Sequence, residues 1–210
     1  MRDNGGMQQV ITFPEPEPAI AFRRQNRERF SDDAYWAFCQ ANPGLRVERT
    51  AEGEIIVVPP AGGESDYRTL EVAGELRNWA KKDGSGKAFT ASVQFLLHDG
   101  SGLSPDAAWV SNESLGTLSK QERKKFLRLS PEFVVEVRSP SDDLIEAKSK
   151  MQQWIANGVQ LAWLIDGDAQ TVYIYRKGRP MRSRRGLTEL AGEGPVQGFV
   201  LNLAPIWQGL

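Results

Sequence analysis

Glu136 and Arg138 stand two residues apart in the apolar run PEFVVEVR, which covers 131–138. Side chains alternate along a β-strand, so this acid and this base would lie on the same face of the strand. Apolar residues on both faces in its first half predict a central strand that is covered on both sides. A charge in such a place is costly unless it is paired, hydrogen-bonded or bound to a metal. The segment is therefore a candidate for holding a divalent metal ion beside a phosphate group.

Asp106, in the segment LSPDAAWV at 103–110, can supply a second carboxylate. Pro105 fixes the backbone just before it, and we expect 103–110 to be a strand whose end lies near that of 133–138. Metal-assisted hydrolysis of a phosphodiester needs oxygen ligands for the ion and cations that offset charge on the phosphate. Asp106, Glu136 and the main-chain carbonyl of Val137 are ligands of the kind that Mg²⁺ or Mn²⁺ prefers.

The required cation can come from Arg138 or from a lysine of the following segment. A helix is expected over 142–157, with one apolar stripe at about 100° per residue. The stripe comprises Leu144, Ala147, Met151, Trp154 and Ile155. Lys148 and Lys150 border this stripe on opposite sides, from where a lysine can send its ammonium toward the sheet. Lysine can lose a proton and arginine cannot, so Lys148 or Lys150 is the candidate that orients the water, and Arg138 is the candidate phosphate clamp.

The elements that must position these residues alternate between strands and helices. Ser31, followed by two acids, predicts the start of a helix, and Asn157-Gly158 predicts the end of the helix over 142–157. If that helix is a crossover, the strand after it runs parallel to 133–138. The other predicted elements are a hairpin at 45–60, a helix at 66–82, a strand at 88–97, a helix or turn at 120–128, and strands at 161–166 and 171–176.

The 210 residues divide into an arm and one domain. Prolines at every second position in FPEPEPAI favour an extended form, and we expect a flexible N-terminal arm at 1–29 and a folded domain at 30–210. The one cysteine excludes an internal disulfide and favours a reducing compartment, so a cytoplasmic location is expected. No apolar run is long enough for a membrane span, and the first residues lack the apolar stretch of a secretion signal.

The net charge of −1 means that any nucleic-acid contact must use a local basic patch. The densest basic run is KGRPMRSRRG, at 177–186. It is either a solvated hairpin tip or a phosphate contact made by Arg182, Arg184 and Arg185 with their neighbours. Other chemistries are poorly supported, because His98 has no second histidine to build a typical zinc site and no glycine-rich phosphate loop is present.

Several motifs, taken in order, resemble the bacterial Uma2 family, which belongs to the PD-(D/E)xK nuclease superfamily. They are GEIIVVPP, PDAAWV, PEFVVEVRSPSD, KM and NGVQLAWLID, and the similarity covers about 30–207. The resemblance implies an α/β fold of mixed α+β character. Its restriction-endonuclease-like core would be a central mixed β-sheet flanked by helices, in the order helix, three strands, helix, strand.

The resemblance also assigns site residues. It places Pro105-Asp106 at the PD motif and Glu136 at the second acid. Arg138 stands where the superfamily has its lysine, and the matching lysine is Lys150 on the following helix. Glu48 resembles the upstream glutamate of the family, which makes it a further acid of the site. Taken from the residues alone, Glu48 could equally be an exposed charge at a sheet edge.

The function implied is a Mg²⁺- or Mn²⁺-dependent DNA endonuclease, with a homodimer expected by analogy with enzymes that cut both strands. The alternative is a non-cleaving nucleic-acid-binding or regulatory protein on the same fold, favoured by the near-neutral charge and the displaced lysine. A further alternative makes Glu136 and Arg138 a structural ion pair.

Overall fold

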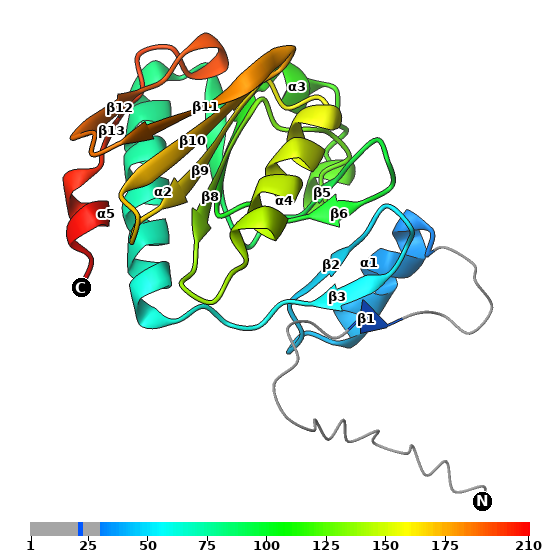
Figure 1. The fold of residues 1–210 in the computed structure, drawn as a ribbon. Helices are drawn as coiled ribbons and strands as arrows, with labels where there is room; N and C mark the ends of the chain where they lie inside the picture. The colour runs from blue at the N-terminus through cyan, green and yellow to red at the C-terminus, as the bar shows by residue number, and fades with distance from the viewer. Residues whose placement is uncertain (1–20, 23–29) are drawn as a thin grey trace, which may run out of the picture.

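A computed structural model describes residues 21–22 and 30–210 of the chain (Figure 1). The arm expected at 1–29 lies outside the described residues, apart from the two that form β1. The helices are α1 (Asp32–Ala41), α2 (Gly63–Asp83), α3 (Asn112–Gly116), α4 (Leu144–Ala156), α5 (Ala204–Gln208) and the 3-10 turns η1 (Glu122–Lys124) and η2 (Gly194–Val196). The strands are β1 (Ala21–Phe22), β2 (Val47–Arg49), β3 (Ile55–Val57), β4 (Gly86–Thr90), β5 (Phe95–Leu96), β6 (Gly102–Leu103), β7 (Ala107–Ser111), β8 (Phe133–Arg138), β9 (Leu161–Asp166), β10 (Thr171–Arg176), β11 (Arg179–Arg185), β12 (Glu189–Ala191) and β13 (Val200–Asn202).

A six-stranded mixed sheet, in the order β11-β10-β9-β8-β7-β4, forms the centre of the molecule. β8 and β9 are parallel and α4 connects them, whereas the other pairs of this sheet are antiparallel. Figure 1 shows α2 on one face of the sheet and α4 on the other. The order α2, β4, β7, β8, α4, β9 is the helix, three strands, helix and strand expected for a restriction-endonuclease-like core, so the predicted fold class is confirmed.

β8 is buried because apolar side chains leave it on both sides. Phe133, Val135 and Val137 pack in the core beneath α2, together with residues of β13 and α5. Val134 packs on the opposite face, with Met151 and Trp154 of α4. This arrangement confirms the prediction of a doubly covered central strand and leaves Glu136 on the α4 face.

A second, five-stranded sheet, in the order β1-β3-β2-β6-β5, stands beside the large one (Figure 1). The predicted hairpin at 45–60 is present as β2 and β3. β1 adds to it, with Ala21 opposite Ile56 and Phe22 opposite Ile55, so this part of the expected arm belongs to the sheet.

The prediction of one continuous strand at 88–97 and another at 103–110 is wrong, because each segment is divided between two strands. The first breaks at a turn after Thr90, and the second breaks at Ser104-Pro105-Asp106. β4 and β7 pair in the large sheet, whereas β5 and β6 pair in the small one. Because the chain crosses between sheets at both breaks, Asp106 lies in the crossing segment immediately before β7.

The helix that carries both candidate lysines begins two residues later than 142, at Leu144, because Asp143 is its N-cap. The Asp143 carboxylate accepts hydrogen bonds from the backbone N–H groups of Ile145 and Glu146. The predicted apolar stripe of α4 packs against the sheet. Ser31 likewise caps α1, by accepting from Ala34 N–H.

Three other segments complete the description of the fold. The basic run at 177–186 is largely an edge strand, β11, rather than a hairpin tip, and all its residues are exposed. The capping box of Ser119 and Glu122 forms in both directions, but it opens only the short η1. The C-terminal apolar residues enter α5. Across the described residues, none of the helices has the length and apolar character needed to cross a bilayer.

Gly86 begins β4, where an added Cβ would meet the Trp109 side chain and the Val110 carbonyl oxygen. We expect Gly86→Ala to lower the free energy of unfolding by about 1–3 kcal/mol, because the core must shift to make room. Gly74, inside α2, faces open space, so Gly74→Ala should raise the free energy of unfolding by about 0.5–1 kcal/mol. Urea unfolding measures both variants, and a change of the same sign and size in the two would contradict the prediction.

Candidate active site

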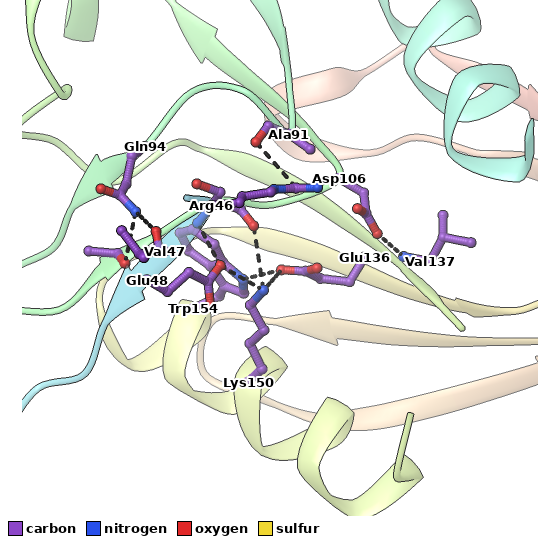
Figure 2. Close-up of polar contacts among 12 residues, drawn as sticks. Arg46, Val47, Glu48, Ala91, Gln94, Asp106, Glu136, Val137, Lys150 and Trp154 are labelled. Carbon is purple, nitrogen blue, oxygen red and sulfur yellow. Dashed lines mark hydrogen bonds and ion pairs between the residues drawn. The ribbon is translucent and has the colours of Figure 1, made fainter. Parts of the chain in front are cut away.

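The Lys150 ammonium lies at the centre of a polar cluster on the α4 face of the large sheet (Figure 2). Its Nζ is 3.1 Å from Glu136 Oε1 and 3.2 Å from Glu48 Oε1. It also donates a hydrogen bond of 3.4 Å to the Ser104 carbonyl oxygen. One side chain of α4 therefore contacts β8, β2 and the segment before β7.

Each carboxylate is also held by a second group. Trp154 Nε1 donates to Glu136 Oε1 at 2.9 Å, and Ser104 N–H donates to Glu48 Oε1 at 3.0 Å. The Glu48 side chain is only 14% exposed, so it is not a free charge at a sheet edge. The Ser104 peptide, which meets both Glu48 and Lys150, fixes the small sheet next to the segment that leads to Asp106.

Asp106 lies against the backbone of the central strand. Its Oδ2 accepts a hydrogen bond of 2.7 Å from Val137 N–H. This contact sets its carboxylate beside the peptide that follows Glu136, so the two acids act on each other electrostatically.

Burial and crowding of charge shift the pKa of all three groups. Burial raises the pKa of Glu136 to about 7; Lys150 opposes this rise, and Asp106 and Glu48 add to it. Burial also raises the pKa of Asp106, against the Val137 hydrogen bond and the positive charges of Lys150 and Arg46. For Lys150, burial alone would lower the pKa, but Glu136, Glu48 and Asp106 outweigh it and raise the pKa. Lys150 is therefore a charged donor at neutral pH.

The two lysines of α4 are separated by the structure. Lys148 lies over the Tyr173 ring, with Nζ 4.3 Å from the ring centroid, whereas Lys150 enters the acidic cluster. Helix geometry in the sequence leaves both lysines open, and Lys150 is the one that the structure brings to the acidic cluster.

Arg138 is not brought into the cluster. Its Nη1 bonds Asp166 Oδ2 at 3.0 Å, and its Nε and Nη2 donate to the Asp142 carbonyl. The alternative of a structural Glu136–Arg138 ion pair is wrong, because the acid that pairs with Arg138 is Asp166 on the neighbouring strand β9. Arg138 thus braces the connection from β8 to α4.

The basic residues of β11 lie apart from the cluster. Arg182 and Arg184 pair with Ile174 and Val172, whose side chains belong to the core cluster on the α2 face of the sheet. Partners across a ladder share a face, so these two arginines are on the face opposite Glu136. Arg185 alternates to the Glu136 face, but two strands separate β11 from β8, a span of roughly 14 Å. A DNA contact by these three residues remains a prediction.

Arg46 is a residue of this site that the motifs did not single out. It precedes β2 and its side chain extends toward Asp106 (Figure 2), where its charge lowers the pKa of that carboxyl. The sequence held a signal for it, because Arg46 and Glu48 are two residues apart in the hairpin predicted at 45–60, the same spacing as Glu136 and Arg138.

The donor set fits a hard cation. Among the described residues, hydrogen bonds reach Oδ2 of Asp106 and Oε1 of Glu136, which leaves Oδ1 and Oε2 as acceptors without a hydrogen bond. No three Asp, Glu, His or Cys side chains of the described residues gather closely enough to hold an ion by themselves. Mg²⁺ commonly takes one or two carboxylates and keeps several waters, so two carboxylates suffice for it.

A family model described as "Uma2: Putative restriction endonuclease" matches residues 14–204. The chain belongs to the Uma2 family. A similar fold is seen in the crystal structure of "a putative nuclease belonging to DUF820 from Anabaena variabilis ATCC 29413". It has a TM-score of 0.66 and 19% sequence identity, and covers 79% of this chain and 91% of that chain. At this identity the likeness shows the fold. The search of curated proteins gave no significant match.

The paired lysines of this Uma2 protein allow a matched test. Lys150→Met removes the charge that lowers the pKa of Glu136, so that pKa should rise above 7. Lys148→Met should leave it near 7, because Lys148 contacts Tyr173 instead. ¹³C NMR titration of the glutamate carboxyl resonances in metal-free protein measures both. The same Glu136 pKa in the two variants would contradict the assigned geometry.

Glu136 should also make stability depend on pH. Its pKa is about 7 in the folded chain, against an ordinary value of 4.5, so the folded state binds this proton more tightly. Between these two values the free energy of unfolding should fall as pH rises, by roughly 3 kcal/mol for this group. Lys150 stays protonated throughout this window. Urea unfolding at each end of this pH window should show that the free energy of unfolding falls in the wild type but not in Glu136→Gln. The same pH dependence in both proteins would contradict the prediction.

Proposed function

We propose that this Uma2 protein is a metal-dependent DNA endonuclease with a PD-(D/E)xK-type site whose lysine lies on the helix after the second acid. The observation that carries the proposal is the convergence of Lys150 from α4 with Glu136 of β8, near Asp106 in the segment immediately before β7. Two carboxylates at neighbouring strand ends and one lysine are the parts that phosphodiester hydrolysis needs.

Asp106, Glu136 and the Val137 carbonyl would hold Mg²⁺ or Mn²⁺. When bound, such an ion polarises the scissile phosphate and lowers the pKa of a water. A divalent cation would also favour the ionised forms of Asp106 and Glu136, whose pKa values are raised by burial.

The protein groups have separable tasks in this proposal. Lys150 keeps Glu136 and Glu48 in one orientation through its contacts to both. Because its pKa is raised, it acts through its positive charge beside the attacking water rather than as a base. Glu48 positions Lys150 and the Ser104 peptide.

Plasmid nicking with Mg²⁺ or Mn²⁺ tests the proposal. Asp106→Ala and Glu136→Ala should each remove a metal ligand, and Lys150→Ala should remove the positive charge that holds Glu136 and Glu48. Each variant should therefore lower the nicking rate by about 100-fold or more. Lys148→Ala is the matched control and should nick like the wild type, because Lys148 lies over Tyr173.

The alternative function gives a different result. A wild-type protein that retains the plasmid without nicking it, with either metal, would support the non-cleaving binding protein on this fold. Nicking that survives Glu136→Ala would show that any cutting activity comes from elsewhere.

A further inference from the structure

Lys150 and Arg138, two of the cations that the sequence offers for a phosphate, are already engaged by the protein. A lysine ammonium has three N–H donors, and Lys150 has three acceptors in Glu48, Glu136 and the Ser104 carbonyl. Arg138 uses Nε and both terminal nitrogens on Asp142 and Asp166. A phosphate that came to either side chain would have to displace existing contacts, so the site needs another cation for the substrate.

Arg46 is exposed and lightly held. In the described part of the chain, its five N–H donors make one hydrogen bond, from Nη2 to the Ala91 carbonyl at the long distance of 3.4 Å. Its backbone is fixed, because the Arg46 carbonyl accepts from Val58 N–H at 2.8 Å. The guanidinium is therefore free to bind an incoming anion, while its base is anchored beside the acidic cluster (Figure 2).

A cleft of about 610 Å³ opens next to this side chain. It runs between the small sheet and α2, and its lining includes Arg46, Asp66, Thr69, Ser92 and Ser104. Ser104 is two residues before Asp106 and bonds both Glu48 and Lys150, so one end of the cleft adjoins the cluster. A volume in this range is typical of pockets that hold a ligand of small-molecule size, and it can take a nucleotide-sized segment.

We propose that Arg46 binds the phosphate of the DNA backbone that adjoins the scissile bond, and that the cleft beside it receives this segment of the strand. The inference rests on the proposed nuclease function and names the substrate contact that the acidic cluster lacks. Arginine suits this role because its planar fork donates two parallel hydrogen bonds to a phosphate.

Binding of a fluorescent DNA duplex, measured in EDTA over a series of KCl concentrations, tests the contact. Removal of one phosphate contact should weaken binding by about 10-fold and reduce the slope of log K against log salt by about one. We expect this for Arg46→Ala. Arg46→Lys should keep the slope, because it keeps the charge, with weaker affinity. Arg77→Ala, an exposed arginine farther along α2, is the matched control and should behave as the wild type.

A second pair of variants tests the cleft. Ser92→Asp puts a negative charge on its wall and should weaken duplex binding by about 10-fold through repulsion of the phosphates. Asn78→Asp adds the same charge at an exposed position of α2 outside the cleft and should have little effect.

The outcomes separate this inference from the proposed function. If the wild type nicks plasmid but Arg46→Ala keeps both the affinity and the salt slope of the wild type, the Arg46 contact is wrong and the nuclease proposal stands. If Ser92→Asp and Asn78→Asp bind alike, the strand does not enter the cleft. A wild-type protein that neither binds nor nicks DNA would overturn both proposals.

Discussion

The arrangement of the site depends on one ammonium group placed among three carboxylates. Acids buried this closely repel one another, and their burial is tolerable only with a cation at hand. Lys150 supplies that charge and, because its acceptors come from β2, β8 and the segment before β7, it also joins the two sheets. The contacts of Lys150 that offset the negative charge of the cluster therefore also hold the small sheet against the large one.

The sequence predicted the parts whose signals are local or periodic. The apolar run around Glu136 fixes a doubly covered strand, the stripe of α4 fixes the helix face, and the parallel pairing of β8 and β9 follows from the helix between them. Together these place Glu136 and a lysine of α4 on one face. Helix periodicity could not choose between Lys148 and Lys150, because both border the stripe; the resemblance to the Uma2 family selected Lys150.

The rest depends on contacts between residues distant in the chain. The segments 88–97 and 103–110 each cross from one sheet to the other. The sequence pattern does not reveal this, because the residues on both sides of each break have the character of strand residues. The sequence makes Arg138 a candidate phosphate clamp, but in the structure it forms an ion pair with Asp166 of β9. Arg46 sits outside the motifs, and only the packing of the small sheet against the large one brings it near Asp106.

The exposed strand β11 ends the large sheet and carries Arg179, Arg182, Arg184 and Arg185. An open sheet edge can template the addition of another chain, and natural proteins guard such edges with charge. Two copies that met along this strand would bring rows of guanidinium groups together in a small space. Independently of any ligand contact, the like charges of β11 disfavour edge-to-edge aggregation of the chain.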